Sequence, residues 1–300
     1  MTRKLFFLLF LFSVCSLSAQ SDLTGMFRYR RGSLHRSKPT VVGPYAGRTK
    51  LRWDNLGIYS LVLEGKKEWW RHGYGRIEGE LGAVGHGKIS DRDFFYPEDL
   101  FFDSSLYDET SYGSKGGFFA AIKGLVGWRW CWERCALSFI PVVGVSFREL
   151  RLSLDQGKIF FPGESNLYRL ESFPKHTKVR FHTGSYFLGV DTTWHPCQWL
   201  HIIGRGEIHA SGFTERGCWH LRDYRFLSAA IGPGYVLELH ALFPIQEGCQ
   251  LGLQIGWERW RGFGLPEFYK DFTTEKEYFS KLYHNFFTNT FLSLTLTKAF

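Results

Sequence analysis

The fold class is decided by the last ten residues of the chain, Phe291-Leu292-Ser293-Leu294-Thr295-Leu296-Thr297-Lys298-Ala299-Phe300. Successive side chains of a β-strand point to opposite faces. The three leucines therefore share one face with Phe300, and the serine and the two threonines share the other. An apolar outer face and a polar inner face are typical of a strand in a membrane β-barrel. Any soluble sheet can also end in an alternating strand, so the rest of the chain has to support this interpretation.

The N-terminus has the three parts of a secretory signal peptide. Arg3 and Lys4 supply positive charge, residues 5–12 form an unbroken apolar run, and Ser18-Ala19 supplies small residues for cleavage. The apolar run is too short to cross hydrocarbon as a helix. We therefore expect residues 1–19 to be a signal peptide and residues 20–300 to form a single outer-membrane β-barrel domain.

Ionisable residues recur on one face of several other segments. Arg76, Glu78 and Glu80 alternate with the apolar Ile77 and Leu81. Unpaired charges are costly to bury, which excludes a dry sandwich core, whereas a hydrated lumen accommodates them. The sequence therefore predicts that the lumen is lined by Arg52, Asp54, Arg76, Glu78, Glu80, Lys123, Glu207 and Glu258.

The spacing of the alternating segments predicts about ten strands. They lie at about residues 22–30, 48–64, 68–86, 116–131, 136–153, 178–195, 198–213, 224–243, 249–263 and 284–300. Short connections at 65–67, 132–134, 196–197 and 245–248 alternate with long ones at 31–47, 87–115, 154–177, 214–223 and 264–283. This rhythm predicts an all-β, transmembrane, antiparallel up-and-down β-barrel. An even number of strands puts both termini in the periplasm and the long loops outside the cell.

Tryptophans cluster near the predicted short turns, where an aromatic girdle would meet the membrane surface. They are Trp69, Trp70, Trp128, Trp130, Trp132, Trp194 and Trp199. Ordinary core packing is the alternative role for each. A lumen of ten strands is largely filled by side chains, which disfavours a wide diffusion pore but leaves room for a narrow one.

The charge of the chain indicates its partners. Removal of Arg3 and Lys4 would lower the formal net charge from +8 to +6, which suits contact with anionic lipid head groups. We expect outer-membrane lipid, including lipopolysaccharide, as a partner. Nucleic acid is not expected, because an exported chain rarely meets it and the basic residues form no single stripe. We expect no cofactor.

Five cysteines follow the signal peptide: Cys131, Cys135, Cys197, Cys218 and Cys249. The first two flank a predicted three-residue turn, so a disulfide between them is possible. An odd number leaves at least one thiol free or joined to another molecule. Disulfide-linked envelope proteins are therefore candidate partners. A metal site is not expected, because the chain has no CxxC pair and His195 is a lone companion of Cys197.

Several stretches resemble the omptins, outer-membrane proteases built on a ten-stranded barrel. They are Lys50-Leu51-Arg52-Trp53, Trp69-Trp70, residues 85–94 (GHGKISDRDF), residues 107–111 (YDETS) and Ser211-Gly212-Phe213. The same features are similar to the Protochlamydia outer membrane protein family, barrels of chlamydia-like bacteria with the same Leu-x-Trp strand. That family implies surface or pore-forming proteins rather than proteases.

The omptin resemblance implies a catalytic water held between two aspartates and an Asp-x-His pair. Asp91 and Asp93 match the first pair, and His220 matches the histidine. Cys218 stands where the pattern has its second aspartate. Without that carboxylate the imidazole loses the group that orients it, a loss that costs orders of magnitude in comparable triads. Asp223 is a possible substitute if the loop folds back.

Three functions follow, in different classes. The first is a non-enzymatic envelope barrel, exposed at the cell surface and either structural or forming a narrow pore; the missing carboxylate favours it. The second is an omptin-type endopeptidase that uses Asp91, Asp93 and His220, with Asp223 in support. The third is an adhesin or host-contact protein, suggested by long loops such as 87–115. All three place the protein in the bacterial outer membrane.

Overall fold

The computed structural model of the protein describes residues 21–42, 45–69, 72–96, 105–132, 136–154, 158–160, 178–219, 224–264, 266–271, 277–281 and 284–300. The predicted signal peptide, residues 1–19, lies outside these ranges. Within them, no helix is long and apolar enough to span a bilayer.

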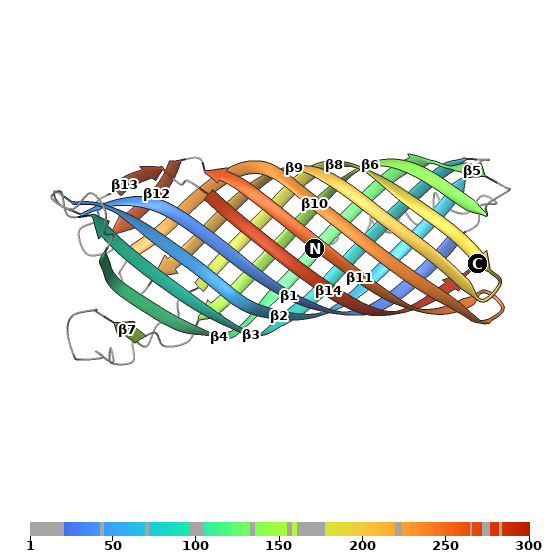
Figure 1. Ribbon diagram of the computed structural model, residues 1–300, viewed down its shortest axis with the longest axis horizontal. Helices are drawn as coiled ribbons and strands as arrows, with labels where there is room; N and C mark the ends of the chain where they lie inside the picture. The colour runs from blue at the N-terminus through green and yellow to red at the C-terminus, as the bar shows by residue number, and fades with distance from the viewer. Residues whose placement is uncertain are drawn as a thin grey trace, which may run out of the picture.

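Ten long strands form a closed antiparallel barrel (Figure 1). They are β1 (Ser21–Val42), β2 (Tyr45–Trp69), β3 (Gly73–Tyr96), β4 (Ser105–Trp128), β6 (Leu137–Leu154), β8 (Lys178–Cys197), β9 (Leu200–Trp219), β10 (Tyr224–Gln246), β11 (Cys249–Gly264) and β14 (His284–Ala299). Each pairs with its neighbours in the chain, and β14 closes the barrel on β1, from Asp22 opposite Ala299 to Ser37 opposite His284. The predicted barrel of ten strands is confirmed.

Four short strands are added to the barrel. β5 (Trp130–Trp132) pairs with β6, and β7 (Lys158–Phe160) pairs with β4. β12 (Pro266–Asp271) and β13 (Glu277–Lys281) form a hairpin against β10. Figure 1 shows β7, β12 and β13 at the left, which we call the loop end. The short turns and the C-terminus lie at the right, which we call the turn end.

The strands are longer than the sequence predicted. They contain from 16 to 25 residues, whereas about 9–11 are enough to cross a bilayer. Most of the predicted loops 31–47, 87–115 and 214–223 continue as paired strand. Alternation of apolar and polar side chains weakens there because the outward positions face water. Backbone pairing does not depend on that alternation, so the ladders continue beyond it.

One predicted turn is wrong. Gly65 and Lys67 lie within β2, opposite Ile77 and Gly75, and the strand continues to Trp69. Trp69 lies over the glycines of β3: a Cβ on Gly75 would be 2.5 Å from its ring. Because these glycines have no side chain, the Trp69 ring fits over them. The hairpin therefore continues beyond the Gly-Lys-Lys sequence that resembled a turn.

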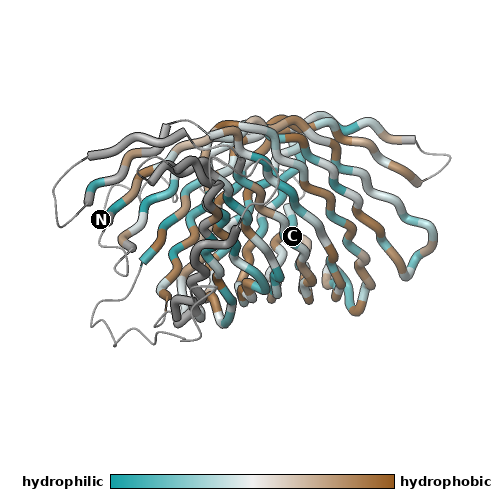
Figure 2. The backbone as a smooth tube through the Cα atoms, turned by 60° about the vertical axis from the view of Figure 1, so that its left-hand side comes forward, coloured by the Kyte–Doolittle hydropathy of each residue, from teal (hydrophilic) through white to brown (hydrophobic). Residues whose placement is uncertain are grey.

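The outer wall of the barrel is apolar. Leu292, Leu294 and Leu296 are each more than half exposed, whereas Ser293, Thr295 and Thr297 are at most 5% exposed. This confirms the two faces predicted for the last strand. Figure 2 shows the same alternation of hydrophobic and hydrophilic residues along the other strands. An open sheet in water would expose its polar face, so this inverted pattern identifies a wall that faces lipid.

Four of the predicted girdle tryptophans are exposed at the turn end: Trp128, Trp130, Trp194 and Trp199. Trp69, the last residue of β2, is partly buried against β3, and the side chains of Trp70 and Trp132 lie outside the described residues. Toward the loop end, Tyr59, Phe147, Tyr186 and Tyr235 are exposed beside the aliphatic belt. Aromatic residues therefore border the apolar wall on both sides, as the two membrane interfaces require.

A bulge between β2 and β3 reverses which residues face inward. Asn55 has a φ of 52°, and the register between the two strands shifts from Asp54 to Gly57. Leu51 and Trp53 are consequently buried, and Arg52 and Asp54 lie on the outer wall, where they pair at 2.7 Å. The prediction that Arg52 and Asp54 line the lumen is therefore wrong. A single inserted residue moves every later side chain to the opposite face.

Candidate functional site in the barrel interior

The middle of the barrel is filled by one connected set of ion pairs, which we call the charge network. Among the described residues it contains seven carboxylates and seven basic groups: Glu64, Glu78, Glu80, Asp191, Glu207, Glu238 and Glu258, with Arg28, Arg30, Lys66, Arg76, Lys123, Arg148 and Arg205. Acids and bases balance in number. Every member is buried or nearly so.

Glu80 is one centre of the charge network. Its Oε2 atom accepts a hydrogen bond from Arg28 Nη1 at 2.8 Å, and its Oε1 atom accepts one from Arg30 Nε at 2.7 Å. Arg30 also donates to Glu258 at 2.8 Å, and Glu258 accepts a further bond from Arg148. Two arginines side by side on β1 are tolerated because both pair with Glu80 of β3.

Glu207 and Glu64 form the other half of the charge network. Lys123 donates to Glu207 at 2.9 Å, and His209 Nε2 lies 3.0 Å from the other oxygen of the same carboxylate. Arg205 meets Glu64 through both of its terminal nitrogens, at 2.9 and 2.8 Å. Such fork-shaped pairs fix geometry as well as charge.

A small cavity lies within the charge network. The cavity between Arg28, Glu80, Lys123 and Glu238 has a volume of about 10 Å³, which is about the minimum for one water molecule. Removing one partner from such a buried pair leaves an uncompensated charge. At this level of the barrel, paired charged side chains therefore fill most of the interior.

Six residues predicted to line the lumen lie in this network: Arg76, Glu78, Glu80, Lys123, Glu207 and Glu258. The predicted lumen set did not include the other eight members: Arg28, Arg30, Glu64, Lys66, Arg148, Asp191, Arg205 and Glu238. The sequence does contain a pattern that places Arg28 and Arg30 inside, because they alternate with Phe27 and Tyr29. The pattern was weak because this segment was the least regular of the ten.

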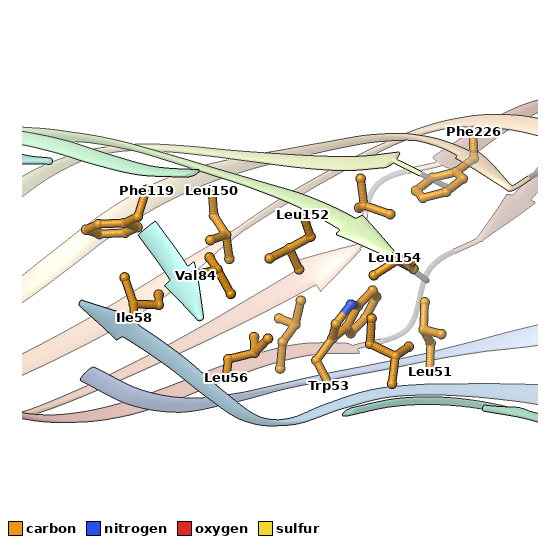
Figure 3. Packing of buried hydrophobic residues seen from close by; sticks show 13 residues of the cluster. Leu51, Trp53, Leu56, Ile58, Val84, Phe119, Leu150, Leu152, Leu154 and Phe226 are labelled. Atoms are coloured by element: carbon orange, nitrogen blue, oxygen red, sulfur yellow. The ribbon is translucent and has the colours of Figure 1, made fainter. Parts of the chain in front are cut away.

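A cluster of apolar side chains fills the barrel on the loop side of the charge network. This apolar core consists of Leu34, Leu51, Trp53, Leu56, Ile58, Val84, Ile89, Phe119, Leu150, Leu152, Leu154, Val179 and Phe226. In β6 it begins directly after Arg148, and in β2 it ends before Ser60. Figure 3 shows Leu150 and Leu152 facing Leu56 and Trp53 across the interior. The charge network and the apolar core thus follow one another along the barrel axis.

The turn end holds histidines and cysteines. The rings of His195 and His201 lie 4.2 Å apart, and Gln250 lies 3.0 Å from His201. Burial lowers the pKa of both histidines, with a smaller contribution from Arg129 for His195 and from His195 for His201. Among the described ranges, no group of three His, Cys, Asp or Glu residues is arranged to hold a metal ion.

Cys131, Cys197, Cys218 and Cys249, the cysteines that the structure describes, form no disulfide with one another, and Cys131 is exposed. Cys135 lies outside the described residues, so its predicted disulfide with Cys131 stays a prediction.

The model of the Protochlamydia outer membrane protein family matches residues 26–297, nearly the whole barrel. The chain belongs to this family. The crystal structure of the outer membrane protease OmpT from Escherichia coli is similar in fold, with a TM-score of 0.69, 12% identity, and coverage of 95% of this chain and 99% of that chain. The family and the omptin-like barrel suggested by the sequence are both confirmed.

Two other barrels match only loosely, and no curated protein matches the sequence. The outer membrane protein OprG from Pseudomonas aeruginosa has a TM-score of 0.32 and 8% identity, with 94% of this chain and 96% of that chain covered. A FadL homologue from the same organism has a TM-score of 0.31 and 8% identity, with 93% and 90% covered. The likeness to OmpT at 12% identity concerns the fold alone.

Of the catalytic residues implied by the omptin resemblance, the structure of this family member describes Asp91 and the backbone of Asp93, near the loop end. Asp91 is buried in β3, opposite Leu51, and faces the barrel interior. Asp93 lies two residues further in the same strand, but its side chain, and all of His220 and Asp223, lie outside the described residues. Cys218, at the position of the missing aspartate, is partly exposed in β9 between Lys178 and Arg225.

Proposed function

We propose that the protein is a surface-exposed, non-conducting barrel of the outer membrane, rather than a pore. The observation that supports this most directly is the charge network, in which the cavity between Arg28, Glu80, Lys123 and Glu238 has room for about one water molecule. The apolar core forms a second barrier in series. An ion that crossed would have to separate paired buried charges and then pass through packed leucines, and both steps are unfavourable.

Conductance in planar bilayers tests this proposal. We expect the purified, folded protein to give no channel steps at moderate voltage, under conditions in which a known porin conducts. Heat-denatured protein is the control for leakage caused by detergent. Regular, reproducible steps from the folded barrel would overturn the proposal and restore the narrow-pore hypothesis.

We also propose an orientation with both termini in the periplasm and the loop end outside the cell. The described part of the chain begins and ends at the turn end, where the Phe300 amide donates to the Ser21 carbonyl at 2.9 Å. Short turns on the periplasmic side and long extensions outside are usual in bacterial outer-membrane barrels. Strands that continue beyond the bilayer would hold the loops away from the membrane.

Lipopolysaccharide is the lipid partner that we propose. Exposed basic residues lie on the outer wall toward the loop end, among them Arg31, Lys88, Arg151, Arg180, Arg216, Arg259 and Arg261. A groove of about 970 Å³ runs from Arg259 and Arg261 along Leu188, Gly206 and Leu237, which suits a phosphate above an acyl chain. Binding should weaken several-fold in the variant with both Arg259→Ala and Arg261→Ala. It should also weaken when the lipid is dephosphorylated.

Omptin-type proteolysis is the alternative, and we propose that it is absent. The carboxylate expected to orient His220 is replaced by Cys218, and Asp223 would have to supply it from the opposite side. We expect the refolded protein with lipopolysaccharide to leave dibasic peptides intact. Cleavage that is lost in Asp93→Ala and His220→Ala would establish the peptidase instead.

A further inference from the structure

A small pocket lies inside the barrel between the charge network and the apolar core. Its lining comes from eight of the ten long strands, all except β2 and β3, and its volume is about 80 Å³. Residues from opposite walls contribute, such as Phe119 of β4 and Trp260 of β11. The pocket is therefore a feature of the interior and not of the outer wall.

Aromatic rings form most of the walls: Phe119, Phe181, Phe213, Trp260 and Phe287. Trp260 is held in place from two sides. Arg148 Cζ lies 4.6 Å above its ring, and its indole nitrogen donates to Glu258 at 3.4 Å. Phe213 meets Trp260 edge to face, with centroids 6.4 Å apart. The walls are therefore formed by fixed neighbours, which is typical of small-molecule sites.

The polar groups of the pocket select for a neutral molecule. Arg148 and Glu258 are bonded to each other, and Glu215 is paired with Arg36 at 3.0 Å, so no charge is left over to attract an ion. Asn289 is different. It is 2% exposed, and its amide oxygen has no hydrogen-bond partner among the described residues. The amide oxygen of Asn285, also in the lining, is likewise unpartnered there.

We propose that this pocket binds a small, neutral aromatic molecule that carries an N–H or O–H donor. The ring would stack against the phenylalanines and Trp260, and the donor would bond the amide oxygen of Asn289. Buried acceptors without a partner are costly, so such a bond has a large effect on affinity. The cavity of about 80 Å³ has roughly half the volume of a protein cavity that binds benzene, ~150 Å³, so the molecule is limited to one small ring such as pyrrole.

Binding of pyrrole, compared with 1-methylpyrrole, tests the donor. Both are titrated into folded protein in lipid nanodiscs and followed by saturation of NMR shifts, with empty nanodiscs as the background. We expect saturable pyrrole binding with a dissociation constant of about 0.1 to 10 mM. 1-Methylpyrrole, which lacks the N–H, should bind about tenfold more weakly or not at all. In Asn289→Leu, the difference between the two molecules should disappear.

Two matched variants locate the site. Ala230 is 2% exposed and lines the pocket on β10, so Ala230→Leu should fill it and abolish saturable binding. Ala241→Leu places the same residue elsewhere on β10, outside the lining, and should leave binding unchanged. Circular dichroism and heat-shifted gel migration verify folding. The proposal would be overturned if the parent protein showed no saturable binding, or if Ala230→Leu and Ala241→Leu bound equally well. If Ala230→Leu does not fold, the result for Asn289→Leu decides alone.

Discussion

At the scale of single residues, the interior of the barrel depends on charges that share partners. Glu80 illustrates this, because one carboxylate serves both Arg28 and Arg30. All three side chains are almost completely buried, so water cannot replace a lost partner. A surface pair behaves differently, since both ions remain solvated when it breaks.

Glu80→Ala should therefore be strongly destabilising. We expect the free energy of unfolding to fall by about 3–5 kcal/mol, because two buried guanidinium groups lose their shared carboxylate. Urea titration of the barrel in lipid measures this. Glu149→Ala is the matched control: Glu149 pairs with Arg151 and Arg180 on the outer wall and is partly exposed. Its removal should cost at most about 1 kcal/mol, and equal losses would contradict a dry interior.

The histidine pair at the turn end predicts a pH dependence. Burial and the neighbouring His195 lower the pKa of His201, so its NMR titration midpoint should lie below the usual value of about 6.5. His195→Asn should move that midpoint upward. Because the unfolded chain binds the proton more readily, the stability contributed by the neutral ring is lost as the pH falls below about 6.5. An unshifted midpoint in both proteins would contradict the coupling.

At the scale of the strand, β14 has two faces that meet different surroundings. Leu294 is 54% exposed on the outer wall, whereas Ser293 beside it is buried among Arg28 and Gln254. In a soluble protein the exposed leucine would be in unfavourable contact with water. In lipid it is the favoured residue, and a charge there is not solvated.

Leu294→Arg should accordingly destabilise the barrel by about 2–4 kcal/mol if this position lies near the middle of the bilayer. The same urea titration in lipid vesicles measures the change. Thr290→Arg, on the exposed face of the same strand but nearer the loop end, should cost about 0–1 kcal/mol. A Leu294→Arg barrel as stable as the parent would mean that this wall does not face hydrocarbon.

At the scale of the whole molecule, the two ends of the barrel carry native thiols that report its orientation. Cys218 is partly exposed toward the loop end, and Cys131 is exposed at the turn end. In variants that keep only one of these cysteines, a membrane-impermeant maleimide should label Cys218 on intact cells. Cys131 should react only after the outer membrane is opened. The opposite pattern would reverse the orientation that we propose.

Sequence by itself determined the class of fold and the family. The alternation of apolar and polar residues in segments such as 76–81 and 292–297 indicates which side chains meet lipid, because a strand has a fixed period of two. Six of the charges now seen in the network could be placed inside on that basis. The outward position of Arg52 and Asp54 could not be predicted in this way. The bulge at Asn55 depends on how β2 and β3 pair, and it does not change the local alternation of apolar and polar residues.

Only the tertiary structure decided which groups the buried charges meet inside the barrel. Whether Arg30 faces water or Glu258 depends on two strands that lie 228 residues apart in the chain, and no local pattern records that distance. The same holds for the aromatic pocket, whose walls come from eight strands. Periodicity determines which way a side chain points; closure of the barrel determines what it meets there.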